Sequence, residues 1–349
     1  MRKSLRSFLV CCAIAVIFGT LPWLKKDTIV VDHYLVHHYD HNYCIGLRGQ
    51  EGIWVPAKGY SYAGEEAIEP HTEWTWEDSP TSCQIQQLSK DSFCKVVFEL
   101  QLKRLFFVGD SLTFQMVNSL WQLLGNNDIF APKGARGYVT RPILCDINLT
   151  EQFTINFQYV RNDHLTLKEG SCHPNYSKDA CLPWVDRYQQ NGDRTLVVAN
   201  MGPHMRDLDV FKTKFDDFVE FAISEMNNTR PADLFMFRTT VPGHDGCSEE
   251  SSPYHNESEF LKIPATSYQW NNFKDYNTYA KKKLSNISEN INGERNRIPI
   301  ILDVYPMTIL RPDGHRLPSV DCLHYLLPGP PDWWNHLLFS HLLEMSSTT

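Results

Sequence analysis

From about residue 94 onward, short apolar runs alternate with amphipathic segments along the chain. The apolar runs have the length of buried strands and lie at 103–108, 195–199, 233–237 and 298–304. Apolar residues recur at helical spacing in segments that lie at 112–124, 207–227 and 270–290. Strands that alternate with helices predict an α/β fold, in which helices cover both faces of a mainly parallel sheet.

The residues before this region have a different composition. Residues 44–94 are rich in Trp, Pro, Gly and Glu and show no helical period, which predicts an irregular segment tied by disulfide bonds. Residues 25–43 contain four histidines, and histidine is a common metal ligand. A polar stem also explains this composition, and we expect a stem rather than a metal site.

The first 24 residues have the pattern of a membrane anchor. Three basic residues precede an uncharged, mostly apolar run, which is at the short end of the length that spans a bilayer. Basic residues before the run favour a cytosolic N-terminus. The alternative is a cleaved signal peptide and a secreted protein, but no small-residue cleavage site follows the run. The predicted parts are a cytosolic tail at 1–7, a signal anchor at 8–24, a stem with a Cys/Trp-rich segment at 25–93, and a catalytic domain at 94–349.

Glycosylation motifs and cysteines agree with an address in the secretory pathway. Asn-x-Ser/Thr sequons occur at Asn148, Asn175, Asn227, Asn256 and Asn286. Eight of the ten cysteines lie outside the apolar run, and this even number predicts disulfide bonds in an oxidising compartment. No CxxC pair occurs, which argues against a zinc ribbon or a thioredoxin-like site. The net charge of −8 and the lack of a basic run argue against nucleic-acid binding.

Candidate catalytic residues follow the predicted strands. Ligands of parallel α/β sheets bind beyond the carboxyl ends of the strands. The first strand is followed by Gly109-Asp110-Ser111, so that Ser111 starts the next helix, where the helix dipole favours developing negative charge. Ser111 is therefore a candidate nucleophile whose own backbone N–H forms part of an oxyanion hole. The alternative is a serine that only caps the helix.

The next two strand ends offer groups that can assist such a nucleophile. Asn200, in the sequence Asn200-Met-Gly-Pro-His204, can donate its side-chain amide to an oxyanion, or it can serve only as a turn residue. Arg238 follows the third strand. It can bind a substrate, stabilise charge or pair with a buried carboxylate.

An Asp-x-x-His pair lies near the C-terminal end of the chain. A serine nucleophile needs an imidazole base whose tautomer is fixed by a carboxylate, and Asp321 and His324 can supply both from one loop. A Pro-Gly-Pro-Pro turn and the pair Trp333-Trp334 follow. The two tryptophans either stack on sugar rings or pack a C-terminal helix onto the sheet. No Gly-x-Ser-x-Gly elbow occurs, which disfavours the α/β-hydrolase arrangement.

Four motifs occur in a characteristic order, namely GDSL at 109–112, NMGPH at 200–204, FRTTVPGH at 237–244 and DCLHYLLPGPPDWWN at 321–335. Together they resemble the plant trichome birefringence-like polysaccharide O-acetyltransferases, which belong with the PC-esterases in the GDSL/SGNH superfamily. The resemblance extends over residues 94–340 and includes His315 in the sequence Arg-Pro-Asp-Gly-His. It implies an SGNH-hydrolase-like three-layer αβα sandwich.

The resemblance implies a role for each matched residue. Ser111 would be the nucleophile, His324 the base and Asp321 the carboxylate that orients it. The backbone N–H of Ser111 and the amide of Asn200 would form the oxyanion hole. Further candidates for substrate contact are His204, Arg238, Trp333 and Trp334, and the implied disulfide joins Cys247 and Cys322.

Two positions depart from the family pattern. The family has an arginine three residues after the serine, associated with the oxyanion hole, and this chain has Phe114. Arg238 and Arg141 are the candidates to replace it. The family also has a cysteine two residues after the motif histidine, and this chain has Leu326, so one family disulfide is expected to be missing or rerouted.

The resemblance implies an enzyme of the Golgi or the ER, with single-pass type II topology, that moves an acetyl group onto glycan hydroxyls through an acetyl-serine. It implies no bound cofactor, an acetyl donor such as acetyl-CoA or an acetylated carrier, a glycan acceptor and an acetyl-donor transporter as a partner. Two alternatives remain: a carbohydrate or lipid O-acyl esterase, and a non-catalytic glycan-binding protein. Phe114 is the one hint of the latter, and the intact Ser111, Asp321 and His324 argue against it.

Overall fold

The computed structural model describes residues 44, 47–57, 74–79, 83–131, 137–147, 152–167, 180–264, 267–290 and 298–347. The predicted anchor at 8–24 and the histidines of 25–43 lie outside these residues. Residues Asp40–Thr349 form one compact unit. Among the described helices, none is both long enough and apolar enough to cross a bilayer.

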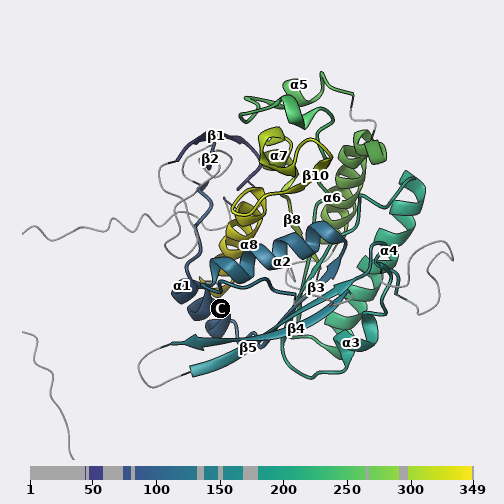
Figure 1. Ribbon diagram of the computed structural model, residues 1–349. Helices are drawn as coiled ribbons and strands as arrows, with labels where there is room; N and C mark the ends of the chain where they lie inside the picture. Colours follow the sequence, from purple (N-terminus) through teal and green to yellow (C-terminus); the bar gives the residue numbers. More distant parts are fainter. Residues whose placement is uncertain are drawn as a thin grey trace, which may run out of the picture. The chain divides into compact units, whose positions relative to one another are not determined.

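A six-stranded sheet lies at the centre of this unit (Figure 1). From one edge to the other its strands are β4 (Tyr138–Asp146), β5 (Gln152–Arg161), β3 (Arg104–Gly109), β6 (Thr195–Ala199), β7 (Leu234–Arg238) and β8 (Ile300–Leu302). The strands from β5 to β8 run parallel, while β4 pairs antiparallel with β5. The sheet is therefore mixed but mainly parallel.

The four apolar runs correspond to β3, β6, β7 and β8, so those strand predictions are confirmed. The sequence pattern did not predict β4 and β5. Buried positions alternate with more exposed ones along most of both strands, as expected for strands with one face less buried than the other. Such strands lack the continuous apolar run that marks a buried parallel strand.

Helices cover both faces of the sheet, which confirms the predicted three-layer arrangement (Figure 1). On one face α1 (Lys90–Glu99), α2 (Ser111–Leu123) and α8 (Pro330–Ser347) pack against one another. The other face carries α3 (Val185–Gln189), α4 (Leu208–Ser224) and α6 (Phe273–Asn290). The helices predicted at 112–124, 207–227 and 270–290 are α2, α4 and α6.

Shorter elements complete the fold. The short helices are α5 (Glu257–Phe260) and α7 (Tyr305–Thr308). Single 3₁₀ or π-helical segments lie at Glu225–Thr229, Cys247–Glu249, Ser267–Asn272 and Pro312–Gly314. Two separate antiparallel pairs are formed by β1 (Gly52–Pro56) with β2 (Trp74–Asp78), and by β9 (His315–Leu317) with β10 (Asp321–Tyr325).

The described residues before α1 are ordered against the C-terminal part of the chain. Trp54, on β1, donates its indole N–H to the carbonyl of Met307 at 2.8 Å. Its ring meets those of Trp76 and Trp333 edge to face, at 5.5 and 5.8 Å between centroids. The prediction of an irregular segment is therefore wrong for β1 and β2, whose buried tryptophans order them without a helical period, whereas residues 84–89 form no helix or strand and the disulfide between Cys44 and Cys83 agrees with the predicted tie.

Disulfide bonds join Cys44 to Cys83, Cys94 to Cys145, and Cys247 to Cys322. The second of these links α1 to β4. The third confirms the pairing that the family resemblance implies. Cys181 is disulfide-bonded as well. Of the predicted sequons, Asn148 and Asn175 lie outside the described residues, whereas those at Asn227, Asn256 and Asn286 are exposed.

The C-terminal helix α8 is buried on most of its surface and is bonded to α2 by polar side chains. Asn335 donates to the Met116 carbonyl and to Ser119 Oγ, each at 2.9 Å. Ser119 in turn donates to the Asp332 carboxylate. Because these groups are buried, each needs such a partner to offset the loss of water. The network therefore fixes how α8 sits on α2.

A buried histidine of α8 makes stability depend on pH. His336 Nδ1 accepts a hydrogen bond from the Leu88 backbone N–H at 3.2 Å. Burial lowers the pKa of His336 to about 3. An unfolded chain binds that proton near the ordinary histidine value of about 6.5, so stability is full above this pH and falls as the pH is lowered through the interval.

We expect His336→Asn to reduce the acid sensitivity of the fold. The wild type should lose about 2 kcal/mol more unfolding free energy than the variant between about pH 7 and about pH 5. Urea denaturation at both pH values measures this difference, which is independent of any constant cost of the substitution. Equal losses in the two proteins would show that the buried ring is protonated without penalty.

Candidate active site

Three of the predicted residues meet beyond the carboxyl end of β3. Ser111 Oγ lies 2.7 Å from His324 Nε2. On the other side of the ring, His324 Nδ1 lies 2.9 Å from Asp321 Oδ2. The side chains of His324 and Asp321 are 29% and 25% exposed, so a substrate can reach them. This is the geometry of a Ser-His-Asp triad, in which the carboxylate fixes the tautomer of the base.

The turn between β3 and α2 presents Ser111. A Cβ atom at Gly109 would overlap Thr113 Oγ1 and the Asn200 carbonyl, so only glycine fits at this turn. Asp110 is the N-cap of α2, and its carboxylate accepts the N–H groups of Leu112 and Thr113 at 2.9 and 3.2 Å. The suggestion that Ser111 is only a cap is therefore wrong.

Capping by Asp110 leaves the Ser111 backbone N–H available. The first N–H groups of a helix have no partner inside the helix. Asp110 satisfies two of them, and no acceptor for the Ser111 N–H lies among the described residues. That N–H also lies at the positive end of the helix dipole, where it can donate to a developing oxyanion.

Gln115 aligns the base with the nucleophile. It lies one helical turn after Ser111, on the same side of α2. Its amide donates to the Tyr325 carbonyl at 2.7 Å and accepts the Tyr325 N–H at 3.0 Å. Because Tyr325 follows His324 directly, these two bonds hold the base beside α2. Sequence reasoning missed Gln115, although its spacing of four from Ser111 is a usable signal.

A buried pair of histidines, His244 and His315, packs against β10. His244 Nδ1 and His315 Nε2 are 2.7 Å apart. The other nitrogens of the pair lie 2.9 Å from the Ile309 carbonyl and 3.3 Å from the His324 carbonyl, respectively. Burial lowers the pKa of His244 to about 4 and that of His315 well below the ordinary range. Both rings are therefore neutral at neutral pH.

The loop that follows β7 approaches β10 closely. The His244 N–H donates to the Cys322 carbonyl at 2.9 Å. A Cβ atom at Gly243 would overlap that carbonyl and the Trp270 ring, so the approach requires glycine. The disulfide between Cys247 and Cys322 closes the same contact covalently. Asp321 and His324 are thus carried by a segment held on both sides.

Asp321 is held in its charged form. Burial opposes ionisation, but the backbone N–H groups of His324 and Leu323, each 3.1 Å from Asp321 Oδ1, and the imidazole outweigh it. Together these partners lower the pKa of Asp321. A charged carboxylate at Nδ1 keeps the proton on that nitrogen and leaves Nε2 as the acceptor for the Ser111 hydroxyl.

Asn200 lies at the carboxyl end of β6 and is fully buried. Its side-chain N–H₂ donates to the Arg238 carbonyl at 2.9 Å. A primary amide has a second N–H donor, and the Asn200 backbone carbonyl lies next to Gly109 at the site. The predicted role in the oxyanion hole remains a prediction.

Arg238, Trp333 and Trp334 are buried, with exposed fractions of 0%, 4% and 0%. Arg238 lies over the Trp334 ring at 4.8 Å, interacts with the charge of Asp110 and has a pKa lowered by burial to about 10. The Trp334 N–H donates to Thr308 Oγ1 at 2.8 Å. In this structure these three side chains are therefore not accessible to a substrate, and the tryptophans pack in the core, as the packing alternative predicts.

Phe114 stands where the family has an arginine, and Arg141 is one of the two candidates to replace that arginine. Phe114 packs its ring on Tyr159, at 5.3 Å between centroids. Arg141 lies over Trp121 at 4.1 Å and pairs with Asp128 at 2.7 Å. Trp121 is ten residues along α2 from Ser111, roughly 15 Å by helical rise. Arg141 therefore does not replace the arginine that is missing at Phe114.

A second polar cluster lies beside the triad. Arg161, at the end of β5, forms two bonds of 3.0 and 3.1 Å to the buried carboxylate of Asp163. His204, a predicted substrate-contact residue, lies 3.3 Å from the same carboxylate and is 32% exposed. Sequence reasoning missed Arg161 and Asp163, because β5 itself was not predicted.

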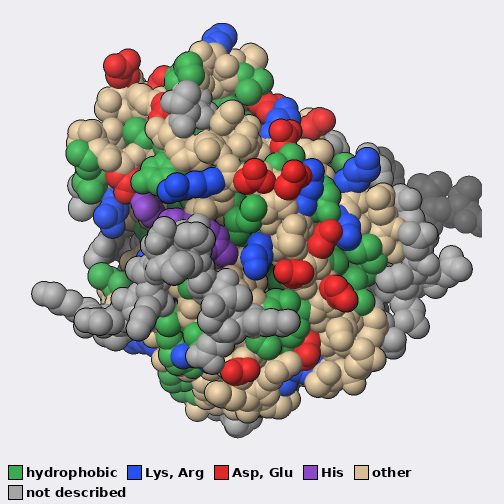
Figure 2. All heavy atoms as spheres, turned by 90° about the vertical axis from the view of Figure 1, so that its right-hand side faces the viewer, with side chains coloured by type: hydrophobic (Ala, Val, Ile, Leu, Met, Phe, Trp, Pro, Cys, Tyr) green, Lys and Arg blue, Asp and Glu red, His purple; other side chains and the backbone are tan. Residues whose placement is uncertain are grey.

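Figure 2 views the unit from the side toward which the parallel strands point in Figure 1. Histidine side chains gather on this face beside Lys and Arg side chains. Within the described part of the chain, no group of three or more His, Cys, Asp or Glu side chains is arranged to hold a metal ion.

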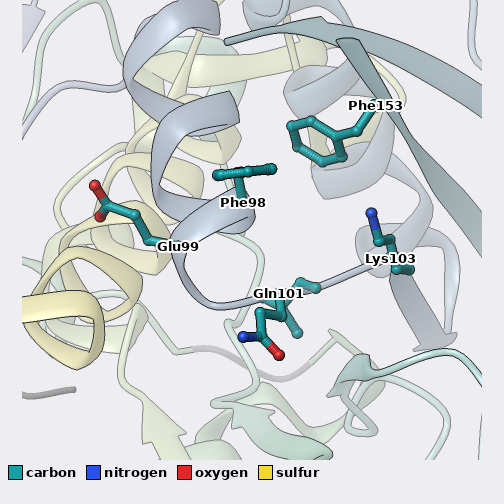
Figure 3. A pocket seen from close by; sticks show the side chains of 6 residues that line it. Phe98, Glu99, Gln101, Lys103 and Phe153 are labelled. Carbon is teal, nitrogen blue, oxygen red and sulfur yellow. The ribbon is translucent and has the colours of Figure 1, made fainter. Parts of the chain in front are cut away.

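A pocket of about 480 Å³ lies away from these residues, where the chain leaves α1 and enters β3 (Figure 3). Phe98 and Phe153 form one side of it, and the Lys103 ammonium lies 5.1 Å from the Phe153 ring. Since Lys103 precedes β3 and Ser111 follows it, the pocket is at the opposite end of the strand from the triad. It contributes no residue to the candidate active site.

Comparison with known proteins agrees with the family suggested by the motifs. Residues 184–341 match the PC-Esterase family, described as a GDSL/SGNH-like acyl-esterase family found in Pmr5 and Cas1p. The chain is 24% identical over 341 residues to trichome birefringence-like protein 25 of Arabidopsis thaliana, covering 78% of this chain and 68% of that protein. It is 22% identical over 324 residues to xylan O-acetyltransferase 3 of Oryza sativa subsp. japonica, covering 78% and 67%.

A third relative covers a shorter region. Xyloglucan O-acetyltransferase 4 of Populus trichocarpa is 27% identical over 145 residues, which is 36% of this chain and 32% of that protein. Residues 184–341 therefore match the PC-esterase family, and the chain is similar to trichome birefringence-like proteins and to polysaccharide O-acetyltransferases. The predicted resemblance is confirmed, and the matches support an acyltransferase or an esterase.

We expect Asp321→Asn to slow covalent modification of Ser111 by a fluorophosphonate probe roughly 10³- to 10⁴-fold, because an amide at this position favours the wrong tautomer of His324. Intact-mass kinetics of labelling give the rate. Asp128→Asn is the matched control, since Asp128 also accepts from a ring N–H and pairs with a cation, but far from Ser111. A labelling rate equal to that of the control would contradict the role of Asp321.

Proposed function

We propose that this protein is an O-acetyltransferase that moves an acetyl group onto hydroxyls of a glycan through an acetyl-serine intermediate. The observation that carries the proposal is the continuous chain of hydrogen bonds from Ser111 through His324 to the charged Asp321, at the N-terminus of a capped helix. An acetyl ester of a sugar hydroxyl is also the product that the names of the xylan and xyloglucan relatives imply.

In the first half-reaction, Ser111 Oγ attacks the carbonyl carbon of the acetyl donor while His324 Nε2 takes the hydroxyl proton. The carbonyl oxygen becomes an oxyanion, and we assign the Ser111 backbone N–H and the second amide N–H of Asn200 as its donors. The intermediate collapses when the bond to the leaving group breaks. The leaving group takes the proton from His324, and an acetyl-serine remains.

In the second half-reaction, a sugar hydroxyl attacks the acetyl-serine and gives its proton to His324 Nε2. The same N–H donors stabilise the second oxyanion. Its collapse breaks the bond to Ser111 Oγ, which regains a proton from His324, and releases the acetylated glycan. The Asp321 carboxylate stabilises the imidazolium in both halves without taking the proton itself.

An esterase is the second candidate function, because the same residues hydrolyse an ester when water replaces the sugar hydroxyl. The description of the matched family as acyl-esterases favours it. Transfer requires that a bound acceptor compete with water, which depends on positioning and exclusion of water. We favour transfer because the relatives that cover most of this chain include xylan O-acetyltransferases.

We expect the full-length chain, purified in detergent, to form an acetyl adduct on Ser111 when it is incubated with an activated acetyl donor. Intact-mass spectrometry detects the adduct, and Ser111→Ala should form none because it lacks the nucleophile. Ser119→Ala is the matched control, since Ser119 lies on the same helix but bonds to Asp332 in the core.

Added xylan or xyloglucan oligosaccharides distinguish the candidate functions. Faster loss of the adduct with formation of acetylated oligosaccharide establishes a transferase. Release of free acetate at a rate that does not depend on the oligosaccharide establishes an esterase. A folded wild-type chain that forms no adduct with acetyl-CoA or with an activated acetyl ester would overturn both and favour a glycan-binding protein.

We also propose that the enzyme works in the lumen of the Golgi or the ER, held by its predicted N-terminal anchor and supplied with acetyl groups by a transporter. Disulfide bonds between Cys94 and Cys145 and between Cys247 and Cys322 support an oxidising environment. The exposed sequon asparagines on the described surface are open to glycosylation.

Glycosylation tests this location directly. The chain produced in a eukaryotic cell should lose mass on treatment with peptide N-glycosidase, because the sequons at Asn227, Asn256 and Asn286 are exposed. Changing these three asparagines to glutamine should reduce the shift. A chain whose mass is unchanged by the enzyme would place the folded unit outside the secretory lumen.

A further inference from the structure

The candidate active site has no cation at the position where the resemblance leads one to expect an arginine. Phe114 occupies that position and packs against Tyr159 on β5. The oxyanion hole described so far contains only neutral N–H donors. A full positive charge next to the oxyanion stabilises it more than a neutral donor does, because hydrogen bonds to ionised groups are about twice as strong.

Arg161 is brought to the same place from the neighbouring strand. In the parallel register of β3 and β5, Arg161 lies directly opposite Gly109. The N–H of Asn162 donates to the Gly109 carbonyl at 3.1 Å, so the chain after Arg161 also runs alongside the turn that presents Ser111. Adjacent strands are about 4.8 Å apart, well within the reach of an arginine side chain.

Arg161 also lies on the face of the sheet that carries α2 and Ser111. Residues two apart on a strand point to the same face, so Arg161 shares the face of Tyr159. Tyr159 contacts Phe114 of α2 and donates its hydroxyl to the Asp110 carbonyl at 3.0 Å. Arg161 therefore lies on the face that α2 covers, at the end where α2 begins.

A buried carboxylate holds the guanidinium in one orientation. Arg161 Nε and Nη2 bond to the two oxygens of Asp163, which is 2% exposed. His204, from the loop after β6, contacts the same carboxylate at 3.3 Å. The bond to Asp163 raises the pKa of Arg161 above its ordinary value, with burial acting in the opposite direction.

This arrangement leaves one guanidinium nitrogen for a substrate. Nε and Nη2 are used by Asp163, and Nη1 has no bonded partner among the described residues. The side chain is 34% exposed, in contrast to the fully buried Arg238. A guanidinium that is held by two bonds and open at its third nitrogen is already oriented before a ligand arrives, which limits the entropic cost of binding.

We propose that Arg161 is the oxyanion-stabilising cation of this enzyme, that it takes the place of the arginine missing at Phe114, and that Asp163 and His204 position it. The proposal rests on the acetyl-serine mechanism above. Nη1 donates to the acetyl oxygen when that oxygen becomes negatively charged, in both half-reactions. No proton is transferred to or from the guanidinium.

The test measures the rate of Ser111 acetylation by intact-mass spectrometry on the full-length chain. Arg161→Gln should lower the maximal rate roughly 100-fold, the effect of removing one oxyanion-hole donor, with little change in the donor concentration at half-maximal rate. Arg161→Lys should recover only part of the loss, because an ammonium cannot bond to Asp163 with two parallel N–H groups. Arg141→Gln, on the adjacent strand and also ion-paired, is the matched control and should react at the wild-type rate.

Two further measurements separate a catalytic from a structural role. Methylguanidine at low millimolar concentration should accelerate Arg161→Ala and leave the wild type unchanged. Adding Phe114→Arg to Arg161→Gln should restore the rate at least about tenfold, since it returns a cation to the same oxyanion from α2. A purely structural role predicts neither rescue.

The outcomes also distinguish this proposal from the function on which it depends. If the wild type forms no adduct on Ser111, the proposed function fails. If the wild type forms the adduct and Arg161→Gln does so at the same rate, only the role of Arg161 is overturned. If Arg161→Gln does not fold, Arg161→Lys and the methylguanidine experiment on Arg161→Ala remain as tests. A wild-type rate in Arg161→Lys together with no effect of methylguanidine then overturns the role of Arg161.

Discussion

Two hydrogen bonds between the side chain of Gln115 and the backbone of Tyr325 bring the nucleophile and the base together. Ser111 is fixed by β3 and by the start of α2, whereas His324 arrives from a part of the chain more than two hundred residues later. Helix α2 and strand β10 pass each other there, and the side-chain amide of Gln115 bonds to both the N–H and the carbonyl of Tyr325. A one-residue slip of β10 would turn the imidazole away from the serine, because successive strand residues point to opposite sides.

The surrounding structure keeps that alignment in place from several sides. The buried network of Ser119, Asp332 and Asn335 fixes α8 on α2, and the chain reaches α8 directly after the triad strand. A disulfide and the loop at Gly243 hold the other flank of β10. The second half of the long C-terminal motif, from Gly329 onward, is therefore explained by packing, whereas Asp321 and His324 belong to the triad. Its tryptophans serve the core.

The sequence predicts four of the five parallel strands, because β3, β6, β7 and β8 lie in continuous apolar runs. It also predicts the triad, because each member follows a strand or lies in a distinctive motif. It does not predict β5, whose half-exposed pattern carries a weaker signal. Without β5, the sequence does not identify Arg161 and Asp163 as candidate site residues. Burial of the two tryptophans in α8 likewise depends on tertiary packing, since a paired aromatic motif reads the same in a core and on a surface.

The buried pair of His244 and His315 has a property that follows from counting hydrogens. Its ring nitrogens face the Ile309 carbonyl, each other, and the His324 carbonyl, which makes three contacts that each need one hydrogen. Two neutral imidazoles carry only two. One contact must therefore set lone pair against lone pair, and the longest, at 3.3 Å, is the one to His324. The contact that holds β10, the strand of His324, against the histidine pair therefore lacks a hydrogen in the neutral state. Uptake of a single proton by the pair would supply it and strengthen the contact.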